Sequence, residues 1–317
     1  MMPCRLFSFI ELSCHEDNSY FLQSFTNIKL KNTTTGEIEK IITQLKHKNS
    51  CGYDEVTTKI LKMVSPFIVS PLTHICNRML STGTFPDRLK YSEIKPIYKK
   101  GDKTQIANYR PISLLPVFSK IFEKVLYKRL YNHLSSNNIL AKEQFGFRCN
   151  TSTEMAIYTL INSILLSLNA KTLVGGLFCD LQKAFDCVNY DILLSKMKFY
   201  GITGVASRLM ESYLRNRYQR VVINNYSSTW KEVQHGVPQG SVLGPLLLLI
   251  YINDLSKSIS DKSIPILFAD DTSFIITNHD DSNFRHKVNE VFNKTNKWFH
   301  SNLLMLNYDK TFFAISN

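Results

Sequence analysis

The feature that most constrains the fold of this chain is a pair of adjacent acidic residues, Asp270 and Asp271, between two apolar runs. The runs cover Ile264 to Phe268 and Phe274 to Thr277, so they predict a strand, a tight turn and a second strand. Both carboxylates would then lie at the tip of a hairpin. Neighbouring carboxylates beside apolar surface raise each other's pKa unless a cation compensates them. The pair therefore indicates either a solvated turn or a cation site.

Charge and composition narrow the class of partner. The 317 residues include 38 Lys and Arg against 26 Asp and Glu, a formal net charge of +12. This excess favours a polyanion such as nucleic acid, although many basic proteins are merely soluble. Seven scattered cysteines without a C-x-x-C pair predict neither a zinc site nor a disulfide framework. The longest apolar run is too short to span a bilayer and no signal peptide is recognisable, so we expect a soluble, intracellular protein without a membrane partner.

Helical periodicity dominates the first half of the chain. We expect a poorly defined arm over residues 1–24 and a helical extension over residues 25–77, followed by one larger domain over residues 78–317. The predicted elements are helices over 35–46 and 56–80, the second broken near Pro66, a basic hairpin around 93–112 and an amphipathic helix over 113–134.

Strands and helices alternate in the second half. The continuous apolar run Leu173 to Cys179 predicts a buried strand that ends at Asp180. The further predicted elements are helices over 154–168, 192–200 and 206–214, a hairpin over 219–234, a helix over 246–255, the acidic hairpin, a helix over 283–300 and strands near 304–306 and 312–315. From residue 173 this order predicts an α+β fold with a ferredoxin-like βαββαβ sheet.

Several short motifs accompany the acidic pair in a fixed order. They are Gly52-Tyr53-Asp54, Gly83-Thr84-Phe85-Pro86, Pro96-Ile97-Tyr98-Lys99-Lys100-Gly101-Asp102, Asn108-Tyr109-Arg110-Pro111-Ile112-Ser113, Gln144-Phe145-Gly146-Phe147-Arg148, Phe178-Cys179-Asp180-Leu181, Asn216-Arg217-Tyr218-Gln219 and Pro238-Gln239-Gly240-Ser241. With them the chain, from about Phe25 to its last residue, resembles the reverse transcriptases of non-LTR, LINE-like retrotransposons of the jockey type.

The resemblance implies a right-hand polymerase whose fingers and palm occupy residues 78–317, with the thumb missing. Polymerases of this type use two Mg²⁺ ions, or Mn²⁺, held by carboxylates. It implies that Asp180 and Asp270 bridge the two ions, that Asp271 completes the acidic cluster and that the backbone carbonyl of Leu181 faces one ion. An all-oxygen site of this kind suits magnesium.

The resemblance also assigns residues to the incoming nucleotide. Phe185 would lie under the sugar and collide with a 2′-hydroxyl, and its alternative is an ordinary core phenylalanine. Arg110 matches a triphosphate-binding arginine, with Lys100 or Lys99 as a second positive charge. For the lysines the alternative is a solvated charge run.

Two further positions follow from the same resemblance. Gln239 and Gly240 would pack against the nascent base pair, because small residues allow close approach of the backbone. Lys310 would lie near the pyrophosphate and donate a proton to it. The alternatives are an ordinary loop residue for Gln239 and a surface lysine for Lys310.

The function implied is RNA-directed DNA synthesis, in which deoxynucleoside triphosphates are added to a DNA primer on an RNA template. Basic side chains would follow the backbone of the RNA–DNA hybrid without reading its bases; these are Lys120, Lys124, Lys128, Arg129, Arg148, Arg215, Arg217 and Arg220. The alternatives are a catalytically inert nucleic-acid-binding remnant of such an element and an RNA-synthesising enzyme, against which Phe185 argues.

Overall fold

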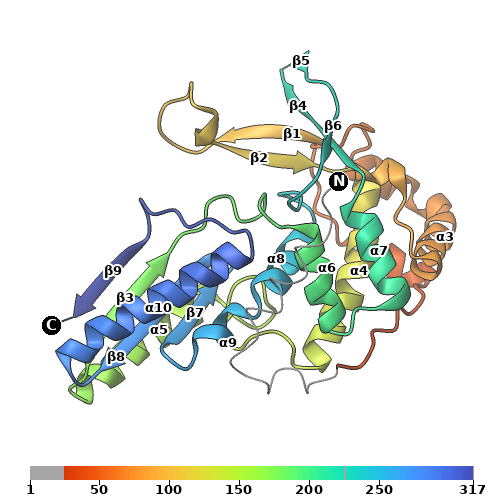
Figure 1. Ribbon diagram of the computed structural model, residues 1–317. Coiled ribbons are helices and arrows are strands. Elements are labelled where there is room, and N and C mark those ends of the chain that lie inside the picture. Colours follow the sequence, from red (N-terminus) through yellow and green to blue (C-terminus); the bar gives the residue numbers. More distant parts are fainter. Residues whose placement is uncertain (1–24, 225, 317) are drawn as a thin grey trace, which may run out of the picture. The chain divides into compact units, whose positions relative to one another are not determined.

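The computed structural model describes residues 25–224 and 226–316, and Figure 1 shows their helices and strands. The arm expected over residues 1–24 lies outside this part of the chain. Two compact units are distinguished: unit 1 takes in residues 138–192 and the described residues from 248 onward, and unit 2 takes in residues 26–137 and 193–247. The boundary expected at residue 77 stays a prediction. No helix in the described part of the chain is long and apolar enough to cross a membrane.

Four helices lie wholly within unit 2: α2 (Thr35–Thr43), α3 (Thr58–Thr82), α4 (Val117–Ser136) and α7 (Gly204–Leu214). The side chains of Thr34 and Thr57 cap α2 and α3 by accepting hydrogen bonds from backbone N–H groups. Helix α3 runs unbroken through Pro66 and Pro71, so the predicted break near Pro66 is wrong. Both prolines lie on the exposed side of the helix, where water can hydrate the carbonyl groups that they leave without a donor.

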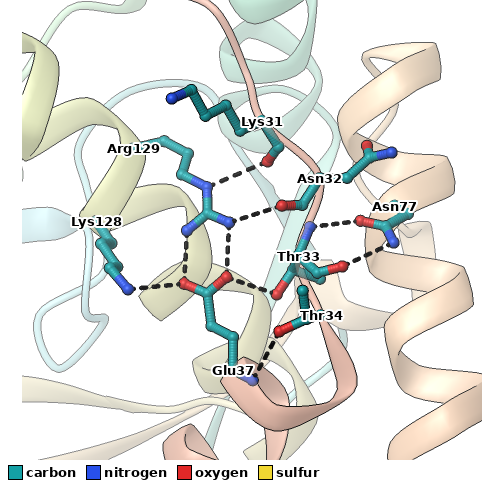
Figure 2. Close-up of polar contacts among 8 residues, drawn as sticks. All are labelled: Lys31, Asn32, Thr33, Thr34, Glu37, Asn77, Lys128 and Arg129. Atoms are coloured by element: carbon teal, nitrogen blue, oxygen red, sulfur yellow. Dashed lines mark hydrogen bonds and ion pairs between the residues drawn. The ribbon is translucent and has the colours of Figure 1, made fainter.

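A charged cluster holds the start of α2 against α4 (Figure 2). Glu37 accepts hydrogen bonds from the guanidinium of Arg129 at 2.6 and 2.7 Å and from Lys128 at 3.1 Å. Arg129 also donates to the backbone carbonyls of Lys31 and Asn32, each at 3.2 Å. The hydrogen bonds from Arg129, more than any other contact, lower the pKa of Glu37 to about 2. Arg129 therefore has a structural partner on every side of its head group.

The sheet of unit 2 is built from β1 (Tyr91–Tyr98), β2 (Tyr109–Leu114), β4 (Arg217–Ile223), β5 (Tyr226–Ser227) and β6 (Lys231–Val233). Its order is β2-β1-β4-β5, with β6 also paired to β4. Strands β1 and β2 are antiparallel and form the predicted basic hairpin, in which Ile97 lies opposite Arg110. Strands β4 and β6 form the second predicted hairpin. Short 3-10 turns, Asp87–Lys90 and Ile106–Asn108, precede β1 and β2.

The sheet of unit 1 has the order β7-β8-β3-β9, and all neighbouring strands are antiparallel. The strands are β3 (Leu173–Cys179), β7 (Ile264–Phe268), β8 (Asp271–Asn278) and β9 (Phe312–Ser316). Helices α5 (Thr153–Asn169), α9 (Leu255–Ile259) and α10 (Asp281–Ser301) belong to this unit. Helices α6 (Tyr190–Phe199) and α8 (Gly244–Ile252) begin in one unit and end in the other.

Alternation along β3 divides the core of unit 1 between the two faces of its sheet. Val174 packs with Ala156 of α5, and Ile266 and Ile275 join the same apolar cluster. At the next position, a Cβ on Gly175 would lie 2.5 Å from the ring of Phe313 and 2.8 Å from the ring of Phe284. The glycine therefore lets two aromatic rings close on the backbone of β3. The strand predicted near residues 304–306 is reduced to one bridge, Leu306 to Leu181.

Candidate active site

The acidic pair occupies a tight turn, as predicted. Phe268 of β7 pairs with Asp271 of β8, which leaves a two-residue turn of Ala269 and Asp270. Ala269 has φ +58°, a backbone conformation in which turns ordinarily use glycine. The residue is nevertheless 7% exposed, so the strained position lies inside the protein.

Strand pairing brings Asp180 to the same end of the sheet. Cys179, the last residue of β3, pairs with Thr272 of β8. Asp180 therefore follows β3 where Asp271 begins β8. The structure brings together the three carboxylates that the sequence selected, because antiparallel neighbours place the end of one strand beside the start of the next.

Burial and neighbouring negative charge both act on the carboxyl group of Asp271. Partial burial, followed by the charges of Asp270 and Asp180, raises the pKa of Asp271 above its usual range. The positive charge of Lys310 opposes the shift. A divalent cation between the carboxylates would remove the repulsion that remains.

Two side chains beyond β3 hold the carboxylate of Asp180. Lys310 donates to its Oδ2 at 2.9 Å, and the side chain of Asn307 donates to the same oxygen at 2.9 Å. The backbone N–H of Asn307 also donates to the carbonyl of Asp180 at 2.9 Å. Lys310 thus lies at the acidic site, on Asp180, and half of its side chain is exposed. Asn307 was missed in the sequence, although it stands in the same short segment as Lys310.

The chemistry of these residues fits a hard divalent cation. Asp180, Asp270 and Asp271 offer only oxygen ligands, and Leu181 beside them is buried and paired to Leu306. In the described part of the chain, no three His, Cys, Asp or Glu side chains converge closely enough to hold a metal ion between them. Lys310 and Asn307 both donate to Oδ2 of Asp180 in this arrangement.

Phe185 lies five residues beyond Asp180 and is half-buried rather than sealed in the core. Its ring meets that of Phe147 edge to face, with centroids 6.2 Å apart. Backbone hydrogen bonds from Asp186 and Cys187 to the carbonyl of Lys183, at 2.8 and 3.1 Å, fold the turn that carries it. Part of the Phe185 ring is therefore open to solvent, on a turn that is fixed by its own backbone.

The other predicted nucleotide-binding residues belong to unit 2. Arg110 in β2 and Lys100 in the loop after β1 are exposed. The backbone N–H of Ser113 donates to the carbonyl of Gln239 at 2.8 Å, so β2 is attached to the Gln239-Gly240 loop. Gly240 has φ +119°, and a Cβ there would lie 2.9 Å from the carbonyl oxygen of Ser113. Glycine is required at this position on both counts.

A fully buried carboxylate, that of Glu123, stabilises this loop, and no sequence motif pointed to it. Glu123 of α4 accepts hydrogen bonds from the backbone N–H groups of Val242 and Leu243, at 2.6 and 3.4 Å, and from Ser119 at 2.9 Å. Burial raises its pKa, and the nearby charge of Arg217 opposes that shift. Because both backbone donors directly precede α8, Glu123 fixes the segment that links the Gln239-Gly240 loop to this helix.

Several arginines expected on a nucleic-acid surface have structural roles instead. Arg217 is 2% exposed and donates to the carbonyl of Tyr213 at 3.0 Å, so its predicted surface role is wrong. The side chain of Arg129 is 11% exposed within the Glu37 cluster, which excludes the same role for it. Arg220 pairs with Glu93 at 2.5 Å. The carboxylates that bind Arg129 and Arg220 lie 92 and 127 residues away in the chain, so side-chain size and charge could not reveal them.

The chain is similar in sequence to proteins of a known family. The family description "Reverse transcriptase (RNA-dependent DNA polymerase)" matches residues 97–316. The chain is 32% identical over 298 residues to a probable RNA-directed DNA polymerase from transposon BS of Drosophila melanogaster, with 90% of this chain and 32% of the relative covered. It is 33% identical to the corresponding X-element protein (74% and 26% covered) and 30% identical to that of the mobile element jockey (84% and 30% covered), both from the same fly.

The chain thus spans about a third or less of the length of these relatives. A solved structure of apo telomerase from Candida tropicalis, truncated from its C-terminal domain, has a TM-score of 0.53 at 14% identity, with 82% of this chain and 56% of that chain covered. This second likeness concerns the fold alone. The resemblance drawn from the ordered motifs is confirmed, and the chain belongs to the reverse transcriptase family.

Proposed function

We propose that this chain carries the RNA-directed DNA polymerase activity of a jockey-type non-LTR retrotransposable element. In this reaction it would transfer deoxynucleotides to the 3′-hydroxyl of a DNA primer paired to an RNA template. The observation that carries the proposal is the meeting of Asp180 with Asp270 and Asp271 at one end of the unit 1 sheet, in a member of the reverse transcriptase family. The strand order β7-β8-β3-β9 supports reading this sheet as a ferredoxin-like palm.

The three aspartates would hold two Mg²⁺ ions, or Mn²⁺, with help from the carbonyl of Leu181. Such a metal pair activates the primer hydroxyl and stabilises the departing pyrophosphate. Lys310, whose ammonium group donates to Oδ2 of Asp180, would lie beside the metal pair. From there the half-exposed side chain would protonate the leaving group.

The remaining residues would bind and select the nucleotide. Exposed Arg110 and Lys100 offer positive charge to a triphosphate, and Arg110 offers a fork of donors. Gln239 and Gly240 would support the nascent base pair, on a loop fixed by Ser113. Phe185 would exclude ribonucleotides by contact with a 2′-hydroxyl. RNA template, DNA primer, their hybrid and deoxynucleoside triphosphates are therefore the proposed partners.

Primer extension on an RNA template tests this proposal. The full chain, supplied with Mg²⁺ and deoxynucleoside triphosphates, should extend an annealed DNA primer by bases complementary to the template. Chelation of the metal should stop the reaction. Absence of templated extension with both Mg²⁺ and Mn²⁺, from folded protein, would contradict the proposal.

A second function is favoured by one observation, the ion pair between Asp180 and Lys310. If this pair is permanent, the chain is an inert nucleic-acid-binding remnant. Salt-sensitive binding of RNA–DNA hybrid without any metal-dependent extension would identify that case.

A further inference from the structure

The backbone of the acidic turn needs support from outside the hairpin. Ala269 adopts φ +58° without the freedom of glycine, and it directly precedes Asp270. Any rotation about its backbone would re-aim the two carboxylates that follow. The hairpin hydrogen bonds between β7 and β8 end at Phe268 and Asp271, so they leave the turn itself unsupported.

A buried glutamine supplies that support. The side chain of Gln144, which is 3% exposed, accepts a hydrogen bond from the backbone N–H of Ala269 at 2.9 Å through Oε1. Its Nε2 donates to the carbonyl of the same residue at 3.2 Å. Both backbone polar groups of the strained residue are thus satisfied by one amide. Oε1 also accepts from the N–H of Gly146 at 2.8 Å, which fixes the amide in turn.

The chain around Gln144 lies along β7 and keeps the amide in register. Leu267 donates to the carbonyl of Glu143 at 2.8 Å, and Phe145 donates to the carbonyl of Leu267 at 2.8 Å. A Cβ on Gly146 would collide with the backbone nitrogen of Ala269, so only glycine permits this approach. The segment therefore forms a short extension of the sheet that ends at the acidic turn.

The same segment reaches the residue proposed to select the sugar. Phe147 has φ +56°, rare for a bulky side chain, and its ring packs edge to face on Phe185. Strained backbone of this kind is retained where surrounding contacts hold it and where function depends on it. The segment 143–147 thus holds one residue with positive φ, Ala269, and contains another, Phe147.

We propose that Gln144 is a positioning residue that sets the metal-binding geometry of Asp270 and Asp271 through the backbone of Ala269. The inference rests on the proposed function, since it assumes that these carboxylates bind a divalent cation. It assigns Gln144 no contact with metal or substrate. Its effect comes from an amide that matches the N–H and the carbonyl of one residue, which an apolar side chain of the same length cannot do.

The chain contains a matched structural control. Asn253 is 4% exposed and its side-chain amide also bridges two backbone groups, accepting from the N–H of Ala141 at 2.8 Å and donating to the carbonyl of Ile139 at 2.9 Å. It stabilises the beginning of the same connection, at Ile139 and Ala141, whereas Gln144 stabilises the acidic turn. Loss of either amide removes buried hydrogen bonds, whereas only loss of Gln144 should disturb the carboxylates.

Measurement of metal binding distinguishes positioning of the carboxylates from general support of the fold, without relying on catalysis. Mn²⁺ titration of the full chain, followed by the electron paramagnetic resonance signal of the free ion, would be compared for wild type, Asp270→Asn, Gln144→Met and Asn253→Leu. We expect Asp270→Asn to abolish the tightest binding, Gln144→Met to weaken it by about tenfold, and Asn253→Leu to leave it unchanged at a similar loss of Tm. Extension rates should follow the same order, with kcat for Gln144→Met lowered by about 10- to 100-fold and KM for the primer–template unchanged.

Gln144→Glu gives a second measurement if Gln144→Met does not fold. It keeps the acceptor for the N–H of Ala269 but places an oxygen against the carbonyl of that residue, so it should also weaken Mn²⁺ binding. Wild-type affinity in a folded Gln144 variant, equal losses in the Gln144 and Asn253 variants, or failure of both Gln144 variants to fold would overturn the inference. If Mn²⁺ affinity differs between the Gln144 and Asn253 variants but no variant extends a primer, the positioning role of Gln144 is supported and the proposed activity is contradicted. Absence of Mn²⁺ binding to wild type would overturn the positioning role.

Discussion

Asp271 has a raised pKa whose effect on stability can be measured as a function of pH. Because its pKa is raised in the folded protein, folding favours its protonated form. The contribution of this carboxyl to the free energy of unfolding is fully present below the ordinary Asp pKa of about 3.9, and it is lost as the pH rises through the raised pKa. In chelator, we expect the Tm of wild type to fall relative to that of Asp271→Asn over this window. A Tm difference that is constant with pH, or that changes in the opposite direction, would contradict a raised pKa for Asp271.

Phe185 provides a second test at the scale of one side chain. Replacement of Phe185 by Ala should lower the preference for deoxynucleotides over ribonucleotides in kcat/KM by about tenfold or more, because the 2′-hydroxyl no longer meets a ring. Phe178→Ala is the control, since the ring of Phe178 stacks on Phe312 at 4.9 Å instead. Unchanged sugar preference in Phe185→Ala would favour the alternative of an ordinary core phenylalanine.

At the scale of elements, Glu123 and Arg217 determine how α4 supports the loop before α8. Removal of the carboxylate in Glu123→Leu would leave buried Arg217 without its counter-charge, and we expect a loss of about 3–5 kcal/mol in the free energy of unfolding. The double variant Glu123→Leu/Arg217→Leu should recover part of this loss. Urea unfolding of the single and double variants gives both values, and additive losses would show that the two charges do not interact.

Elements with strong local signals were predictable from the sequence. The apolar run of β3, the acidic hairpin and the amphipathic α4 were all found, because period and turn chemistry are local properties. Pro66 misled the prediction of α3, since the sequence does not tell which side of a helix is exposed. The backbone partners of Glu123 and Gln144 could not be predicted, because they come from segments 119 and 125 residues away.

At the scale of the whole molecule, the net charge gives a less specific guide than the site. The chain carries a formal charge of +12, yet Arg217 is buried and the side chain of Arg129 is only 11% exposed, each with partners of its own. The proposed polymerase activity rests on the family and on the acidic cluster, and the net positive charge is consistent with a nucleic-acid partner. Because the chain spans about a third or less of its relatives, its activity has to be measured on this chain.

Single-turnover primer extension of the carboxylate variants is the sharpest test of whether Asp180 and Asp270 support polymerisation through bound metal. Asp180→Asn and Asp270→Asn should each lower the rate of deoxynucleotide addition on an RNA template by at least about 100-fold, because each removes a charged ligand of the metal pair. Asp261→Asn is the matched control, since Asp261 pairs with Lys294 at 3.2 Å on the surface of the same unit. We expect this control to extend the primer like wild type. Rates for Asp180→Asn and Asp270→Asn that equal the rate of Asp261→Asn would contradict a metal-binding role for these carboxylates.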